Sequence, residues 1–296
     1  MALTLAEGAK LSNDVLLEGV VETVVQDSAV LGRLPFIEIV GNGLTYNREN
    51  VPATAAFFAV GDDWTESTPS FTQVTATLKI LGGDADIDRY LVQTRSNVQD
   101  LESAVVSLKA KAVQRAFDEA FVNGSTAVDA KAFDGIDRLC TVGQTVAMGV
   151  DGAALTLAKL DEAIDTVRDG KPDLLLMSRR TRRTLTALGR ATGSGIVEQD
   201  RDEFGRMVQF YNGIPIGVDD HISDAKTVGA NTDCSTIYAV QFGEGGLVGL
   251  TGPGGLTIER VGALESKDAT RVRVKWYVAL ALFNESKLAR LSGVRP

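Results

Sequence analysis

Alternation of apolar and polar residues predicts a long β-hairpin near the start of the chain. Two strand-like runs, residues 36–49 and 71–81, flank a connection of about twenty residues. In the second run, threonine and lysine alternate with four apolar residues, Val74, Ala76, Leu78 and Ile80. A period of two places one face of a strand on an apolar surface and the other face in water.

The predicted hairpin needs a partner. Compact domains rarely contain so long a connection without secondary structure, and such loops usually serve a function or bind a partner. A single hairpin is also marginally stable in water. We therefore expect another subunit to cover it, with the tip at residues 61–64 reaching furthest. Its candidate intersubunit contacts are Tyr46, Arg48, Glu49, Asp62, Asp63, Trp64 and Phe71.

Apolar residues at steps of three and four predict helices on both sides of the hairpin. Residues 1–34 form an amphipathic arm that needs another surface to hold it. The strongest helical pattern spans residues 97–123, with Ser96 or Asn97 as its N-cap. The pair at 123–124, an asparagine and a glycine, is expected to end this helix in the left-handed conformation.

Short helices and strands make up the remainder. Thr156 caps a helix that Gly170 stops, and Ser178 caps a second helix. Apolar runs predict strands at residues 174–177, 213–218, 236–240, 256–261 and 271–278. The mixture indicates an α+β protein with a mixed or antiparallel sheet rather than a doubly wound one.

Composition and length set outer limits on the class of protein. A chain of 296 residues with 44% hydrophobic content is long enough for one large domain or two modest ones. No apolar run approaches the ~20 residues that a membrane helix needs, and residues 1–7 lack the features of a signal peptide. Cys140 and Cys234 lack CxxC spacing, which favours free thiols in a reducing compartment over a disulfide.

The net charge of −9 argues against an outer surface that binds nucleic acid, because phosphate binding requires clustered lysine and arginine. Two interpretations remain open. The charge gives ordinary solubility, or it makes an acidic wall that does not adhere to DNA enclosed within it.

Motifs for catalysis or cofactor binding are weak. His221 is the only histidine, and it follows two aspartates, Asp219 and Asp220. A metal site requires two or three such ligands that converge, so a surface turn is the favoured interpretation. The glycine-rich segments 193–195 and 243–246 lack the lysine of a P-loop and the spacing of a dinucleotide fingerprint. Asp84, Asp86 and Asp88 lack the glycine and glutamate of a calcium loop. We expect no enzyme, no cofactor and no metal.

A cluster of arginines stands at the start of a predicted helix, where positive charge opposes the helix dipole. It comprises Arg179, Arg180, Arg182 and Arg183. One interpretation is a solvated face. The other is pairing with carboxylates of a neighbouring subunit, which would set register and orientation. The candidate carboxylates are Asp200, Asp202 and Glu203.

The opening of the chain resembles a known family. Residues 5–10 and the run Leu34-Pro35-Phe36-Ile37-Glu38-Ile39-Val40, continued to residue 49, look like the start of tailed-bacteriophage major capsid proteins with the Hong Kong 97 fold. Residues 211–216 resemble a recurrent strand of that family, and the order of elements matches across nearly the whole chain. The resemblance implies a structural protein that assembles into hexamers and pentamers of an icosahedral head around double-stranded DNA.

The resemblance also implies a division of the chain, a location and partners. The particle would be a virion assembled in the host cytoplasm, without a membrane, and with a portal. The parts would be an N-terminal arm at 1–35, an extended loop at 36–83, a peripheral domain at 84–150 and 266–296 that includes the spine helix at 97–123, and an axial domain at 151–265.

Two departures from the family pattern add expectations. Members that mature by proteolysis often carry an N-terminal scaffolding segment, whereas Met1 stands directly at the arm, so we expect a separate scaffolding protein or none. Members that crosslink covalently use a lysine in the extended loop, and residues 36–78 contain none, so we expect a non-covalent shell.

Two other functions stay open at this point. The first is an encapsulin-like nanocompartment, whose shell shares the fold but holds protein cargo. The second is an α+β enzyme, which a monomer with a closed pocket would favour.

Overall fold

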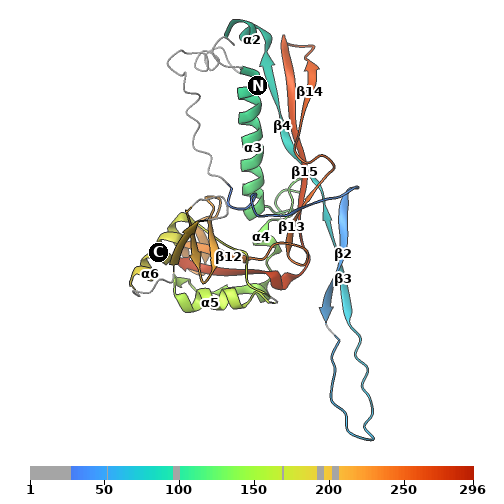
Figure 1. Cartoon of the computed structure of the whole chain (residues 1–296), viewed down its shortest axis with the longest axis vertical. Coiled ribbons are helices and arrows are strands. Elements are labelled where there is room, and N and C mark those ends of the chain that lie inside the picture. Colours follow the sequence, from blue (N-terminus) through green and yellow to red (C-terminus); the bar gives the residue numbers. More distant parts are fainter. Residues whose placement is uncertain (1–27, 52, 96–100, 169, 192–196, 202–206) are drawn as a thin grey trace.

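The computed structural model describes residues 28–51, 53–95, 101–168, 170–191, 197–201 and 207–296. Three parts are distributed along its longest axis (Figure 1). A long helix beside a narrow sheet occupies one end, a compact lobe of strands and helices lies in the middle, and a two-stranded hairpin extends away at the other end. Four short helices connect the longer elements, namely α2 (Arg89–Arg95), α4 (Ile136–Leu139), η2 (Val142–Gln144) and η3 (Glu285–Lys287).

The compact lobe is built on a mixed nine-stranded sheet. Its strand order is β5-β16-β12-β7-β10-β9-β8, with β6 beside β16 and β11 beside β12. Helices α5 (Leu157–Asp165) and α6 (Arg179–Ala191) bury apolar residues in a core cluster with these strands. The strands are β5 (Thr145–Ala147), β6 (Ala153–Ala154), β7 (Leu174–Met177), β8 (Val197–Arg201), β9 (Met207–Tyr211), β10 (Ile214–Val218), β11 (Lys226–Val228), β12 (Asn231–Val240) and β16 (Leu288–Arg295).

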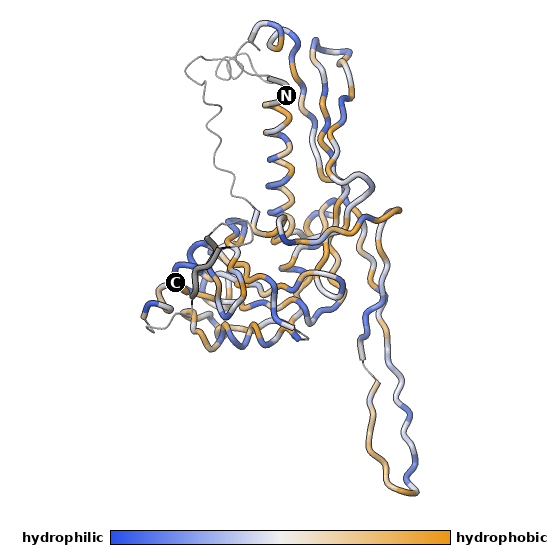
Figure 2. The backbone as a smooth tube through the Cα atoms, in the orientation of Figure 1, coloured by the Kyte–Doolittle hydropathy of each residue, from blue (hydrophilic) through white to orange (hydrophobic). Residues whose placement is uncertain are grey.

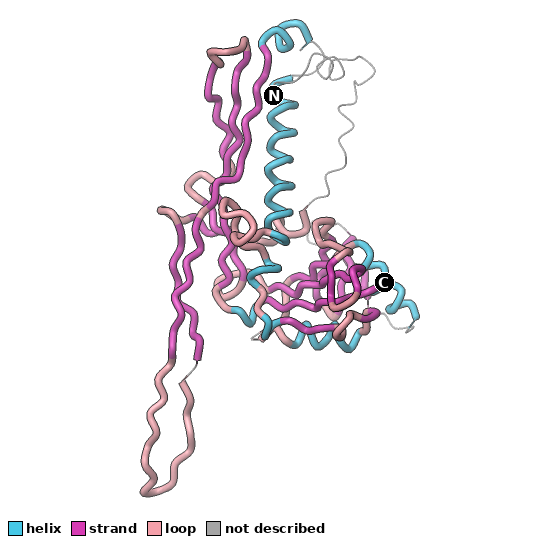
Figure 3. Tube along the Cα trace, turned by 180° about the vertical axis from the view of Figure 1, so that it is seen from behind, coloured by secondary structure: helices cyan, strands magenta, loops and turns pink. Residues whose placement is uncertain are grey.

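The elongated lobe combines a five-stranded sheet with helix α3 (Leu101–Asn123), which runs alongside it in both views (Figures 1 and 3). The strand order is β1-β13-β15-β14, and β4 also pairs with β15. Alternate residues of β15 are buried from Val272 to Val278, as the period of two predicts, whereas its last five residues are all buried. The strands are β1 (Phe36–Glu38), β4 (Lys79–Asp88), β13 (Leu247–Thr251), β14 (Thr257–Ala263) and β15 (Ala269–Leu282).

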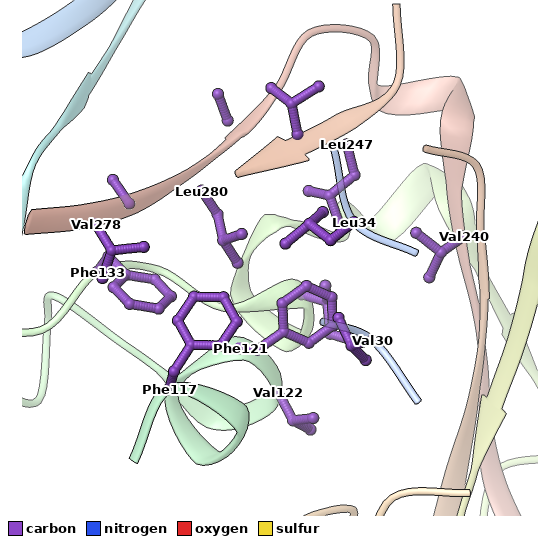
Figure 4. Close-up of a cluster of buried hydrophobic side chains, with 14 of the residues drawn as sticks. Val30, Leu34, Phe117, Phe121, Val122, Phe133, Val240, Leu247, Val278 and Leu280 are labelled. Atoms are coloured by element: carbon purple, nitrogen blue, oxygen red, sulfur yellow. The ribbon is translucent and has the colours of Figure 1, made fainter. Parts of the chain in front are cut away.

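One aromatic cluster joins the end of α3 to this sheet (Figure 4). Phe117 has no exposed surface, and its ring centroid lies 4.8 Å from that of Trp276 and 5.8 Å from that of Phe133. Val30 and Leu34, from the base of the predicted arm, are buried in the same cluster. The arm base is therefore part of the core, while residues 1–27, the rest of the predicted arm, lie outside the described residues.

The hairpin is shorter than predicted, and this is a correction. β1 pairs in parallel with β13 instead of continuing into the hairpin, and a turn at Gly41, with φ of 123°, separates it from β2 (Gly43–Val51). The returning run also splits, because β3 (Ser70–Thr77) pairs with β2 whereas β4 pairs with β15. The period of two continues through Leu78, so alternation alone could not reveal the change of partner.

The division into domains at residue 265 does not match the sheets. β13 and β14 precede that residue but belong to the five-stranded sheet with β15. β16 follows it but pairs with β12, inside the nine-stranded sheet. Strand pairing brings segments distant in the sequence together, so a boundary drawn along the sequence separated strands that share hydrogen bonds.

Helix ends were predicted less well than helices. α3 ends at Asn123 as expected, but neither Asn123 nor Gly124 has a positive φ. Gly124 is needed for space instead, because a Cβ there would lie 2.4 Å from the carbonyl oxygens of Ala120 and Phe133. The start predicted at residue 97 and its cap at Ser96 or Asn97 lie outside the described residues.

The α/β unit after residue 156 gives mixed outcomes. The strand at 174–177 is confirmed, and Ser178 caps α6 by accepting a hydrogen bond from the Thr181 amide at 3.2 Å. Thr156 occupies the N-cap of α5 without a side-chain hydrogen bond, and this helix ends at Asp165, before Gly170. Both cysteines are free and buried.

The described residues contain neither a metal-binding cluster nor a membrane-spanning helix. No cluster of histidine, cysteine, aspartate or glutamate among them could hold a metal ion. None of the helices in the described ranges combines the length and apolar character needed to cross a membrane.

Candidate assembly surfaces

The base of the hairpin is fastened to its own chain. The Tyr46 hydroxyl and the Arg48 Nε atom donate hydrogen bonds to the Leu282 carbonyl oxygen at 2.9 and 3.1 Å. Arg48 also forms an ion pair with Glu285 at 2.7 Å, and the Tyr46 ring packs edge-on against Phe283 with centroids 4.9 Å apart. These contacts orient β2 relative to the end of β15. Tyr46 and Arg48, predicted as contacts between subunits, thus bond within the subunit.

The apolar stripe of the returning strand is also partly covered by its own chain. Ala76 and Leu78 pack against the core cluster, and Val74 is half-buried. Ile80 lies on the other side of the change of partner and is 78% exposed, so the expectation of one continuous stripe is wrong. Phe71, at the far end of β3, stays 66% exposed.

The far part of the hairpin extends away from the rest of the chain and carries both apolar and hydrophilic residues (Figure 2). Phe57 and Val60 are fully exposed and Trp64 is 82% exposed. Trp64 stacks on Phe58 with ring centroids 4.4 Å apart, and the Asp62 carboxylate accepts a hydrogen bond from the Ala59 amide at 2.6 Å. Local contacts therefore shape the tip without burying it.

Beyond Arg48, the charged residues of the hairpin are all acidic. Residues 49–78 contain no lysine or arginine. All of its carboxylates are exposed, namely Glu49, Asp62, Asp63 and Glu66. An exposed apolar surface rimmed by charge is typical of a site for another protein.

Two of the four clustered arginines pair within their own lobe. Arg179 forms a bidentate pair with Asp220 through distances of 2.6 and 2.7 Å. Arg180 donates to the Asp233 carbonyl oxygen at 2.8 Å and lies 3.5 Å from the Asp224 carboxylate. Asp220, Asp224 and Asp233 are remote in the sequence, so this pairing was not predicted.

The other two arginines differ from each other. Arg182 is half-buried, and its Nε atom has no hydrogen-bond partner among the described residues. Arg183 is exposed on α6. Of the carboxylates expected to pair with such arginines, Asp200 lies in β8 opposite Val208, and residues 202 and 203 lie outside the described range, so pairing with a neighbour stays a prediction.

An ion-pair ladder crosses the outer face of the five-stranded sheet, and sequence reasoning missed it. Arg271 pairs with Asp86 at 2.6 Å and Arg273 pairs with Asp84 at 2.7 Å. Hydrogen bonds from these arginines lower the pKa of both aspartates. Asp84 and Asp86, which lack the pattern of a calcium loop, thus hold β4 against β15. Each ion pair contributes little to the free energy of folding, because the pairs are partly exposed to solvent.

A buried carboxylate links the arm base to α3. Asp118 is 9% exposed, and its Oδ1 atom accepts a hydrogen bond from the Ser28 hydroxyl at 2.7 Å. The pKa of Asp118 is raised to about 6, mainly by burial. The nearby Asp219 also raises it, while the Ser28 hydrogen bond and His221 lower it. Burial also raises the pKa of Asp219, which accepts a hydrogen bond from the His221 amide at 2.8 Å.

We expect Asp118→Asn to stabilise the subunit at pH 7. A carboxyl group whose pKa is raised by folding stabilises the folded state at low pH, and this contribution is lost as pH rises from about 4 through 6. At ~1.4 kcal/mol per pKa unit, a rise in pKa from 3.8 to about 6 makes the expected gain from the neutral amide about 3 kcal/mol. Urea unfolding of the unassembled subunit measures it.

The same variant supplies its own control. At pH 4 the native carboxyl is protonated, so the difference in unfolding free energy between Asp118→Asn and the unchanged chain should shrink toward zero. An equal difference at pH 4 and pH 7 would assign the effect to packing instead of charge.

Comparison with known proteins identifies the family. The model of the phage capsid family matches residues 8–293, which is nearly the entire chain. The chain belongs to the phage capsid family. It is therefore a structural protein of an icosahedral phage shell, as the resemblance of its opening residues predicted.

Solved structures share the capsid fold. An encapsulin, SrpI from Synechococcus elongatus PCC 7942, matches with a TM-score of 0.74 and 17% identity over 100% of this chain and 97% of that chain. Microbacterium phage Oxtober96 matches at 0.68 with 16% identity over 100% of both chains. The capsid of a native GTA particle matches at 0.67 with 14% identity over 93% and 92%. No curated protein matches the capsid protein.

Proposed function

We propose that this capsid protein is the major subunit of a tailed-phage head, arranged in hexamers and pentamers around double-stranded DNA. The observation that carries the proposal is the hairpin. Its base is fastened to its own chain, and its apolar, acidic tip contacts no other part of the chain that the structure describes. A capsid subunit with such a tip has its complement on a neighbouring copy. Two different patches that meet head to tail can close into rings.

The sheets suggest the parts of the shell subunit. The five-stranded sheet with α3 would be the peripheral domain and spine, and the nine-stranded sheet with α5 and α6 would be the axial domain. This assignment follows strand pairing instead of the boundary at residue 265. The β2–β3 hairpin would be the extended loop, with Glu49, Asp62, Asp63, Trp64 and Phe71 as its contact residues.

Partners and location follow from the proposal. The subunit would assemble in the host cytoplasm into a virion head, with a portal and a separate scaffolding protein. The net charge of −9 supports a wall that encloses DNA without binding it by sequence.

A shell around protein cargo is the second candidate, because the SrpI encapsulin has a similar fold over 100% of this chain. Because encapsulins and phage capsids share this fold, similarity of fold does not distinguish a shell around protein cargo from a shell around DNA. The family match favours the phage head.

Electron microscopy of the expressed chain tests the proposal. We expect icosahedral particles or capsomer rings, and a monodisperse monomer of 31.4 kDa would refute self-assembly. A denaturing gel should show one band near that mass, because residues 36–78 contain no lysine for a crosslink. A ladder of covalent oligomers would contradict the non-covalent shell.

The contents of the particle decide between the two candidates. Particles from phage-producing cells are treated with nuclease and then opened. Protected double-stranded DNA supports the phage head. A second protein in fixed stoichiometry, without protected DNA, would support a nanocompartment.

A further inference from the structure

Helices α5 and α6 lie at opposite edges of the nine-stranded sheet. α5 packs on β16 and β5, which form one edge, whereas α6 packs near β8, the strand at the other edge. Both helices bury residues in the same core cluster, so both cover one face of the sheet. Their outward surfaces therefore lie toward opposite edges of that face.

The outward surface of α6 is basic. Thr181, Leu185 and Gly189 are buried at four-residue spacing, which fixes the inner side of the helix. Arg183 and Arg190 lie on the exposed side, two turns apart, or ~10 Å along the axis. No hydrogen bond or ion pair joins either guanidinium to another residue in the described part of the chain.

The outward surface of α5 is concave and acidic. A pocket of about 560 Å³ lies between this helix and η2, and three carboxylates line it, Asp161, Glu162 and Asp165. Glu162 is partly neutralised by Lys159 at 2.7 Å, Asp161 accepts a hydrogen bond from the Tyr211 hydroxyl at 2.7 Å, and Arg168 also lines the pocket.

Two acceptors of this pocket have no donor of their own. Asp165 is exposed, and no hydrogen bond or ion pair links its carboxylate to any residue that the structure describes. The Oε1 atom of Gln144, in the pocket wall, is buried without a hydrogen-bond partner among the described residues. Such acceptors match guanidinium groups, which carry only donors.

We infer that the basic face of α6 docks into the acidic pocket beside α5 of a second copy of this chain. The inference rests on the proposed function and names the axial contact of the ring. The two surfaces lie at opposite edges of one sheet, so a single subunit cannot join its own pair. Each subunit would contact one neighbour through its α6 face and the other neighbour through its α5 pocket. Such a head-to-tail contact between two different surfaces can close a ring.

This contact replaces the carboxylates expected from the sequence. Asp200 lies in β8, on the same edge as α6, whereas the acidic pocket lies on the other edge, and residues 202 and 203 lie outside the described range. Opposite charges at opposite edges also exclude the reversed arrangement, because two α6 faces would repel each other.

Charge reversal on each side tests the contact. The pair Arg183→Glu with Arg190→Glu and the pair Glu162→Lys with Asp165→Lys should each lower the yield of capsomers at least about tenfold, since like charges across an interface cost more than the ~1.4 kcal/mol that a tenfold change represents. The four changes together should restore the yield to within about twofold. Sedimentation velocity measures rings, and circular dichroism verifies folding.

Controls separate this contact from others. Glu244→Lys reverses an exposed carboxylate outside both surfaces and should leave assembly unchanged. Normal assembly of either charge-reversed pair, or no recovery in the combined variant, overturns the contact while the proposed function stands. Rescue of the α6 variant by Asp62→Lys with Asp63→Lys would overturn it in favour of the hairpin tip. Failure of the unchanged chain to assemble counts against the proposed function itself.

Discussion

Replacing residues 50–70 by Asn-Gly is expected to give a folded subunit that forms no shells. Glu49 and Phe71 are directly paired in the hairpin, so a two-residue turn can join them. The anchor of Tyr46 and Arg48 on Leu282 is retained. The lost segment contains the exposed Phe57, Val60 and Trp64, which contact no core residue, so the free energy of unfolding should change little while the neighbour's contact disappears.

Electron microscopy and urea unfolding of the same preparation give the two measurements. A variant of full length, Phe57→Ser with Trp64→Ser, separates the apolar tip from hairpin length and should also reduce shell yield. Shells at normal yield from the shortened chain would show that the hairpin is not the main interface.

Phe117→Ala should have the largest effect on subunit stability. Its fully buried ring contacts the rings of Phe36, Phe121, Phe133 and Trp276, with centroids 4.8 to 6.2 Å away. Removing it leaves a cavity where α3, β1 and β15 meet, and burial of this kind is worth about 3–5 kcal/mol. Urea unfolding of the unassembled subunit measures the loss.

Phe57→Ala is the matched control, because it makes the same chemical change at a fully exposed site. It should alter the unfolding free energy by less than about 0.5 kcal/mol. A loss below about 1 kcal/mol for Phe117→Ala would mean that the core closes around the cavity, against the packing described above.

Local patterns predicted the parts of this fold better than their partners. The strand at 174–177 and the end of α3 at Asn123 were correct, because each depends on a continuous apolar run or helical period. The alternation through Leu78 was read as one strand, although its two halves pair with different strands. Periodicity records which face of a strand is buried, not which strand lies beside it.

Charge pairing shows the same limit. Asp84 and Asp86 bond to Arg273 and Arg271, which lie almost two hundred positions later in the sequence. Arg179 likewise pairs with Asp220, so part of the arginine cluster that was expected to contact a neighbouring subunit forms ion pairs within its own chain. The family, by contrast, was evident from a short opening run, since the whole-chain match to phage capsids confirms it.

The position of β16 affects the timing of assembly. This strand pairs with β12 on one side and with β5 and β6 on the other, although more than 130 residues separate it from β6 in the sequence. The nine-stranded sheet therefore cannot close until residues 288–295 have been synthesised. A nascent subunit can form its hairpin early, but it acquires the α5 edge only after β16 is in place. In the contact inferred above, the surface beside α5 that receives a second copy therefore forms only after β16 has paired.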